Sequence, residues 1–371
     1  MNKWLACAVA GAACLVVLIV VASTESAPAR PARKFQNNYL AFEPKGLAAV
    51  LKWRIDSARD GLPPPPTTPI PVVAPDLAFI GANATARAAM QPAVTWIGHA
   101  TVLAQVGGIN LLTDPHFSQR ASPLSFIGPK RHVPPGVALA SLPRIDAVLI
   151  SHNHYDHLDE TSVRGLAAQP GGSPLFIVPL GLKAWFAECG IANVIELDWW
   201  QSHSIDGALG PVEVVLTPVQ HWSGRGLADR METLWGGYAV FAPDQHLFFS
   251  GDTGYSKDFA DIRQRFASRQ AGPQPGFDLA VLAIGAYEPR WFMATQHIDP
   301  SEAVQVHLDL RARHSLGVHW GTFELTDESL DAPPLALAEA RAAKGLADQQ
   351  FFVMAVGETR KLARRAGSAP Q

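Results

Sequence analysis

The sequence predicts an α/β sandwich in which two β-sheets pack face to face and helices cover their outer faces. Three observations predict this fold class. Apolar runs of strand length recur in both halves of the chain, helical segments follow each group of strands, and no repeat with a solenoid period is evident. The chain has 371 residues, so it can bury a substantial core without a structural metal.

The first group of predicted strands begins with a hairpin. Val94–Ile97 and Thr101–Val106 are mostly apolar, Gly107-Gly108 supplies a turn, and the chain returns over Ile109–Thr113. Ile145–Ile150 then has the composition of a short buried strand, which would deliver the chain to the polar residues that follow it.

Further strands and helices continue the pattern. Leu175–Pro179 is a predicted strand, and a helix from about Leu182 can end at Gly190. A later helix has Asp299 as its N-cap and Pro300 in its first turn, and we expect it to reach about Arg313. The remaining predicted elements are a helix over Leu335–Lys344 and strands over Val212–Pro218, Tyr238–Ala242, His246–Ser250, Leu279–Ile284, Ser315–His319 and Phe351–Val356.

The N-terminus is predicted to be a separate segment. Trp4–Ala22 is an uninterrupted apolar run, and about 20 such residues are needed to cross a bilayer. Small residues follow it, as in a signal peptide, so the two alternatives are an inner-membrane anchor and a leader for export to the periplasm. Lys3 precedes the run and further basic residues follow it, which leaves the orientation open.

The domain organisation follows from this boundary. We expect residues 1–34 to be the leader with its linker and residues 35–365 to be a single catalytic domain. Gly61–Pro75 is rich in proline, so it must be extended, and we expect it to wrap over the domain surface.

Charge and cysteine content exclude some classes of function. Lys plus Arg is 30 and Asp plus Glu is 33, a net charge of −3, so no nucleic-acid partner is expected. Cys7 and Cys14 lie in the apolar leader, which leaves Cys189 alone in the body. The body therefore has no disulfide framework and no Cys-x-x-Cys metal motif, so any metal ligands must be nitrogen and oxygen atoms.

Four residues of metal-ligand type follow the predicted strand Ile145–Ile150 directly. Side chains alternate along an extended segment, so His152 and His154 point the same way and can bind one metal. Asp156 and His157 lie just beyond them and can reach a second metal. Imidazole and carboxylate ligands suit two zinc ions, although iron or manganese would also accept them.

The run His-x-His-x-Asp-His resembles that of metallo-β-lactamase-fold hydrolases. The resemblance implies an αββα sandwich and further ligands at later strand ends. His221 would complete the first site, Asp252 would bridge the two metals, and His319 would join the second site. True β-lactamases of this fold often have a cysteine at the bridging position, so Asp252 argues against antibiotic hydrolysis.

Longer segments resemble one branch of that fold. Trp96–Val102, Leu112–Pro123, Ile284–Met293 and Gln296–Ala303 are similar to the phospholipases D that hydrolyse N-acyl phosphatidylethanolamine and their bacterial relatives. The resemblance extends over roughly residues 35–360. It implies a phospholipid substrate met at a membrane surface, and it leaves a homodimer open.

The resemblance also assigns roles within the site. It implies that Tyr155 contacts the lipid and that His297 lies beside the metals and the substrate phosphate. We expect Asp156 and His297 to be the catalytic residues, with His297 either bonding a phosphoryl oxygen or protonating the leaving group. The expected reaction is attack on phosphorus by a hydroxide that the two metals share. A hydrolase acting on a lactone or thioester, and a metal-bound lipid-binding protein without turnover, remain alternatives.

Three further polar residues lie in these family-like segments. His99 and His116 are expected to be structural or to support ligands. Asp114 either holds a ligand histidine from behind or forms a turn before Pro115.

Overall fold

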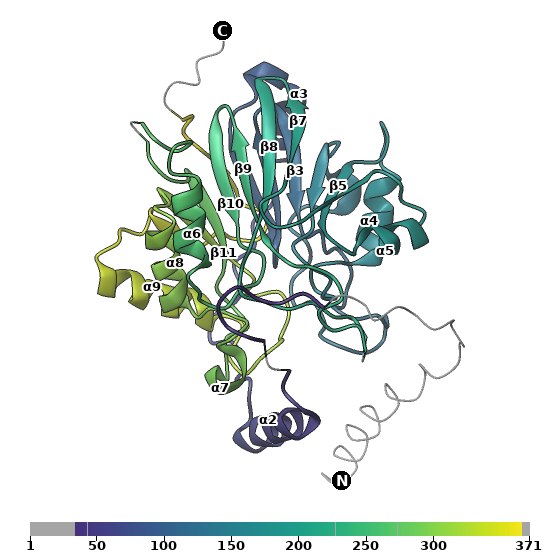
Figure 1. Cartoon of the computed structure of the whole chain (residues 1–371). Helices are drawn as coiled ribbons and strands as arrows, with labels where there is room; N and C mark the ends of the chain where they lie inside the picture. Colours follow the sequence, from purple (N-terminus) through teal and green to yellow (C-terminus); the bar gives the residue numbers. More distant parts are fainter. Residues whose placement is uncertain (1–33, 43, 227, 273, 366–371) are drawn as a thin grey trace. The chain divides into compact units, whose positions relative to one another are not determined.

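Two mixed β-sheets lie at the centre of the computed structural model, which describes residues 34–42, 44–226, 228–272 and 274–365 (Figure 1). The strand order in the first sheet is β14-β1-β2-β3-β4-β5-β6, and in the second it is β13-β12-β11-β10-β9-β8-β7. The first sheet contains β1 (Ala93–Gly98), β2 (Thr101–Val106), β3 (Ile109–Thr113), β4 (Ala147–Leu149), β5 (Leu175–Pro179), β6 (Val194–Leu197) and β14 (Thr359–Lys361). The second contains β7 (Ser202–Gly207), β8 (Gly210–Thr217), β9 (Gly237–Ala242), β10 (Gln245–Phe249), β11 (Leu279–Ala283), β12 (His314–Val318) and β13 (Phe351–Phe352).

The two sheets share one pairing pattern. Strands β14 to β3 and strands β7 to β10 are antiparallel to their neighbours. Strands β3 to β6 and strands β10 to β13 are parallel. As a result β8, β10 and β12 run in the same direction, and the residues that follow them emerge at one edge of the second sheet.

The core lies between the sheets. Trp96 of β1 stacks on Trp320 with 5.1 Å between ring centroids, and both side chains are buried. Tyr238 of β9 crosses from the second sheet to the first, where its hydroxyl lies 2.8 Å and 2.9 Å from the carbonyl oxygens of Ile150 and Ile177. This contact fixes the end of β4, because buried carbonyls need hydrogen-bond partners.

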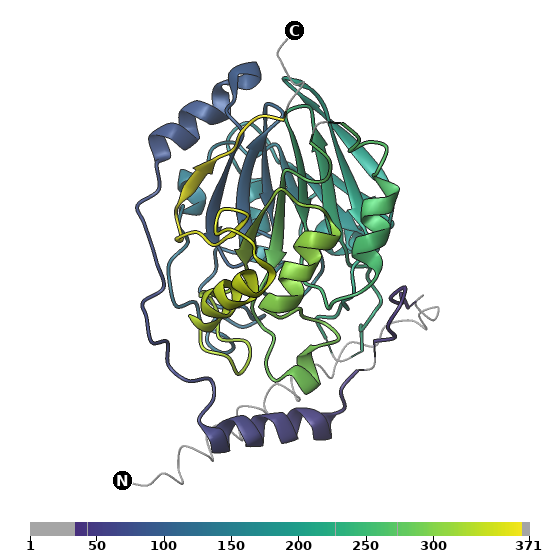
Figure 2. The same cartoon turned by 90° about the vertical axis from the view of Figure 1, so that its left-hand side faces the viewer.

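Helices cover the outer faces, which confirms the predicted α/β sandwich (Figures 1 and 2). The helices α4 (Glu160–Ala167) and α5 (Lys183–Glu188) lie on the first sheet, and α6 (Asp258–Arg265), α8 (Pro300–Asp309) and α9 (Ala332–Lys344) lie on the second. Three more, α2 (Leu47–Asp60), α3 (Leu77–Thr85) and α7 (Arg290–Met293), lie toward the two ends of the sandwich.

Helix α8 begins where the sequence predicts but ends earlier than expected. Its predicted N-terminus is observed: Asp299 accepts a hydrogen bond from the Glu302 backbone, and Glu302 accepts one from the Asp299 backbone. Its end was placed too late, since the helix stops at Asp309 and Arg311 adopts a left-handed φ of 50°. A residue in that conformation cannot continue a right-handed helix.

The expected inner-membrane or periplasmic location is wrong. Among the residues that the structure describes, no helix is long and apolar enough to cross a membrane. The expectation depended on the single apolar run Trp4–Ala22, which lies outside those residues. The described residues, from Lys34 onward, group as one compact unit, and the division into residues 1–34 and 35–365 stays a prediction.

The proline-rich segment Gly61–Pro75 is held on the body by backbone hydrogen bonds of Pro71 and Val73 with Val356 and by the carboxylate of Asp331. Asp331 Oδ2 accepts hydrogen bonds from the backbone and hydroxyl groups of Thr67 and Thr68 at 2.7–3.1 Å, and Oδ1 accepts one from Ser329. Burial opposes ionisation of Asp331, but the hydrogen bonds outweigh it and hold the pKa of this carboxyl well below its usual range.

We predict that Asp331→Asn destabilises the protein by about 1–2 kcal/mol at pH 7, because the amide replaces an ionised acceptor of several hydrogen bonds. A carboxyl with a lowered folded pKa stabilises the fold above its unfolded pKa of about 3.9 and loses that effect as the pH falls. The difference between wild type and variant in urea unfolding should therefore shrink below about pH 4. Exposed Asp206→Asn is the control; an equal effect from both substitutions would contradict the prediction.

Candidate metal centre

The predicted ligands meet at one end of the sandwich, where four strands finish. His152, His154, Asp156 and His157 follow β4, His221 follows β8, Asp252 follows β10 and His319 follows β12. The structure thus brings all seven residues together, although no metal is part of it. Close approach of the two sheets depends on Gly251, which has a φ of 56° and where a Cβ atom would lie 2.5 Å from that of Ser151.

The first cluster consists of three histidines. The His154 Nδ1 atom lies 2.8 Å from His152 Nε2 and 3.3 Å from His221 Nε2. Two nitrogens that bind one zinc ion at 2.0–2.1 Å in tetrahedral geometry are roughly 3.3–3.4 Å apart. The observed spacing is therefore close to that of a shared metal.

The second cluster combines a carboxylate with two histidines. His157 Nε2 and His319 Nε2 are 3.1 Å apart, and each lies 3.3 Å from Asp156 Oδ2. The three residues belong, with His99, to a group whose candidate donor atoms all lie within 4.8 Å of one another, so this cluster also matches the donor set of a divalent metal.

Asp252 lies between the two clusters. Its Oδ2 atom is 3.0 Å from His157 Nε2 in the second cluster and 4.0 Å from both His152 Nε2 and His221 Nε2 in the first. Its Oδ1 atom is 3.2 Å from His319 Nε2. One carboxylate thus faces both clusters, as a ligand shared by two metals must.

Contacts on the far side of the rings orient three of the ligand histidines. The Nδ1–H group of His157 donates to Asp114 at 2.6 Å, and that of His221 donates to the Gln296 carbonyl at 2.8 Å. His152 Nδ1 lies 2.8 Å from the Ser151 hydroxyl, which itself donates to Asp114. Each bond fixes the tautomer that leaves Nε2 free to bind metal. Of the two roles left open for Asp114, the contact with His157 supports the first, in which Asp114 holds a candidate ligand histidine from behind.

Several buried polar atoms at this site have no hydrogen-bond partner among the described residues. Asp252 Oδ1 and His297 Nδ1 face the clusters, whereas His154 Nε2, His319 Nδ1 and His99 Nδ1 lie on the far sides of their rings. Unsatisfied buried polar atoms are rare in proteins, and a site that concentrates them is typical of a position completed by an ion, a substrate or water. The donor set and the two unpartnered atoms that face the clusters together show that the residues fit a metal.

Burial and mutual charge set the protonation of the ligands. Burial lowers the pKa of His152 and His154 well below 6.5 and that of His221 to about 4, so these rings are neutral at pH 7. Burial opposes the charge of His319, but Asp252 and Asp156 outweigh it and raise its pKa to about 9. Because metal ligands must be deprotonated, metal binding at the second cluster has to displace protons.

His99 contacts the second cluster. The sequence alone left open whether this residue is structural or supports a ligand. Its Nε2 atom lies 3.0 Å from Asp156 Oδ2, and its ring centroid is 4.0 Å from that of His319. Its carbonyl accepts a hydrogen bond from the His319 backbone. Only its place in the family-like segment pointed to this role. His116, by contrast, contacts Arg131 and Phe323 and lies outside both clusters.

The two residues expected to meet substrate lie on different sides of the centre. His297 is buried, with Nδ1 3.8 Å from Asp252 Oδ2, and burial lowers its pKa to about 3. Tyr155 is turned away from the clusters: its hydroxyl donates to the Arg225 carbonyl, and the Arg225 guanidinium lies 4.0 Å from its ring centroid. Tyr155 and Trp185 line a hollow of about 330 Å³ beside the centre.

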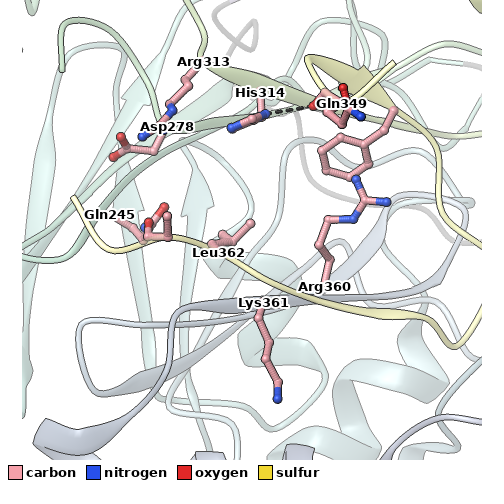
Figure 3. A pocket seen from close by; sticks show the side chains of 10 residues that line it. Gln245, Asp278, Arg313, His314, Gln349, Arg360, Lys361 and Leu362 are labelled. Atoms are coloured by element: carbon pink, nitrogen blue, oxygen red, sulfur yellow. Dashed lines mark hydrogen bonds between the residues drawn. The ribbon is translucent and has the colours of Figure 1, made fainter. Parts of the chain in front are cut away.

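A second hollow, of about 320 Å³, lies at the other end of the sandwich (Figure 3). Its lining includes His314, which begins β12, and Arg360, which stacks on Phe352 at 3.7 Å. His319 follows the opposite end of the same strand. This hollow is therefore separate from the candidate metal ligands, which lie at the opposite end of the sandwich.

Comparison with known proteins identifies the family. Residues 109–320 match the model of a β-lactamase superfamily domain, a segment that contains all seven predicted ligands. The chain belongs to the β-lactamase superfamily. Its fold and its relatives make it a metal-dependent hydrolase, and they confirm the resemblance seen in the sequence.

Two relatives and one solved structure illustrate this placement. N-acyl-phosphatidylethanolamine-hydrolyzing phospholipase D 1 of Caenorhabditis elegans is 42% identical over 71% of this chain and 74% of its own. The mitochondrial enzyme of that activity from Saccharomyces cerevisiae is 39% identical over 63% of this chain and 48% of its own. A metallo hydrolase from Ignicoccus hospitalis shares the fold, with a TM-score of 0.53, 19% identity and coverage of 74% of this chain and 100% of its own.

We predict that the saturated protein holds two metal ions per chain, as measured by elemental analysis. His221→Ala should lose mainly the ion of the first cluster and His319→Ala that of the second, so each variant should retain about one. His203→Ala, on β7 away from the centre, should retain both. A wild-type chain that never binds more than one ion would contradict the two-site arrangement.

Proposed function

We propose that this hydrolase is a two-zinc phosphodiesterase of phospholipase D type, acting on membrane phospholipids similar to N-acyl phosphatidylethanolamine. The observation that supports it most directly is the position of Asp252, whose carboxylate lies within 4.0 Å of ligand nitrogens from both histidine clusters. The donor set would also accept iron or manganese. The substrate class is carried by the named activity of the worm and yeast relatives.

Two bound metal ions would supply positive charge for the phosphoryl oxygens and a water molecule acidic enough to ionise near neutral pH. The chain's own contribution is to hold the ligands. Asp114 and the Gln296 carbonyl orient rings of both clusters, and Asp252 spans them. Such outer contacts keep the donors in place before substrate arrives, so little reorganisation is needed during reaction.

His297 and Tyr155 would handle the substrate. The ring of His297 lies beside Asp252 with an unpartnered Nδ1 atom, so it is placed to bond a phosphoryl oxygen. Burial lowers its pKa to about 3, so the ring is neutral at pH 7 and is better suited to bonding than to protonating the leaving group. Tyr155 lines the neighbouring hollow, where it would contact the lipid.

The test is product analysis with the zinc-loaded chain in H₂¹⁸O. Attack of water on phosphorus breaks the P–O bond to the ethanolamine side, so mass spectrometry should find N-acylethanolamine without label and phosphatidic acid with one ¹⁸O. Label in a fatty acid or an opened lactone would indicate a carbonyl-centre hydrolase instead. Lipid bound without product would indicate a binding protein, and either result would contradict the proposal.

We predict that His297→Ala keeps two metal ions but lowers the rate by about 100-fold, because it removes a hydrogen bond to the reacting phosphate rather than a ligand. Metal content and kcat are measured on the same sample. His203→Ala serves as the control and should change neither quantity. Parallel loss of metal and activity in His297→Ala would show that His297 is a ligand of the centre.

A further inference from the structure

The outer face of helix α2 is apolar although it faces solvent. Leu47, Leu51 and Ile55 are 70%, 52% and 65% exposed. At about 100° per residue they fall within an arc of about 80° on the helix surface, together with Ala58. Single exposed apolar residues are common on protein surfaces. Contiguous exposed apolar side chains on one helix face more often mark an interaction surface.

Basic residues border this apolar face on both sides. By the same angular spacing, Arg54 lies beside Leu47, and Lys52 and Arg59 lie beyond Ile55. The two acidic residues of the helix, Asp56 and Asp60, lie farther round and form ion pairs with Lys52 and Arg59, so the helix keeps one net positive charge from its third basic residue. An apolar face bordered by cations is the pattern of a helix that lies in the interface of an anionic membrane.

The opposite face of α2 is fixed to the rest of the domain. The Trp53 indole and the Ser57 hydroxyl donate to the two oxygens of Asp327, each at 2.8 Å. Trp53 also packs on Phe292 of α7, with 4.8 Å between ring centroids. The apolar face therefore points outward because the other face is already held by buried hydrogen bonds.

Helix α7 connects this surface to the metal centre. Its Met293 carbonyl accepts the backbone N–H of His297, and its Arg290 donates to the His297 carbonyl at 2.9 Å. Trp291 of the same helix is 49% exposed. Both views show α2 and α7 together at one end of the sandwich, with α3 at the other (Figures 1 and 2).

We propose that the outer face of α2, with Trp291, docks on an anionic phospholipid surface, with the helix lying in the plane of the interface. The proposal rests on the proposed function for the substrate that makes such docking useful. It requires no membrane-spanning segment. A phospholipid could then enter the metal centre from the side on which the domain meets its bilayer.

Charge favours a membrane over a second copy of the chain. In an isologous dimer the basic borders of two α2 helices would meet a similar surface, and like charges facing each other destabilise a contact. An anionic bilayer instead offers opposite charge to the net positive charge of the helix and an apolar layer to the leucine and isoleucine side chains.

The experiment measures hydrogen–deuterium exchange of the full chain with vesicles of phosphatidylcholine and phosphatidylglycerol that contain no N-acyl phosphatidylethanolamine. Peptides from residues 47–60 should exchange at least fivefold more slowly with these vesicles, and peptides from residues 77–85 of α3 should not change. Pure phosphatidylcholine should give weaker protection. Unchanged exchange over residues 47–60, or protection that appears with protein concentration alone, would overturn the proposal.

A paired-variant test separates docking from catalysis. The double variant L51Q/I55Q should lose the protection and act at least fivefold more slowly on substrate in anionic vesicles, with an unchanged rate on detergent-dispersed substrate. L77Q/L335Q changes two exposed leucines on α3 and α9 and is the matched control. Equal vesicle rates for the two variants would refute docking through α2. Protection without any hydrolysis would instead refute only the proposed function.

Discussion

The structure depends on two buried carboxylates that face the same group of imidazole rings. Asp114 holds His157 and, through Ser151, His152 from behind, while Asp252 meets both clusters from the front. Both carboxylates are almost fully buried. Such charges are costly to desolvate unless they are paired or bind metal, so the site is assembled as one unit in which each ligand constrains the next.

The pairing pattern of the sheets explains why these residues can meet. Strands β8, β10 and β12 run in one direction, so His221, Asp252 and His319 all emerge at the same edge. Strand β4 of the first sheet ends at that edge too, where Tyr238 ties it to the second sheet. The core between the sheets is therefore what sets the distance between the two halves of the ligand set.

Elements with strong local patterns were predictable, and those that depend on distant partners were not. Strands β2, β3 and β5 have the predicted bounds because their apolar runs are complete in themselves. Strand β7 was missed because Ser202–Gly207 has a single large apolar residue and forms by pairing with β8. The seven candidate ligands could be named from the motif and the family pattern, whereas the supporting contact of His99 joins residues 57 positions apart, which no local pattern contains.

Helix α2 was missed for a related reason that bears on how the site is reached. Its large aliphatic side chains face solvent and only Trp53 and Ser57 are buried, so its sequence lacks the pattern of a helix packed on a core. A helix of this kind adds little to the core, yet it is fixed by two hydrogen bonds to Asp327. The loop that contains Asp327 follows His319, and α7 leads into His297. Helix α2 is thus held by the segments that follow His319 and precede His297, which links the position of its outer face to the geometry of the site.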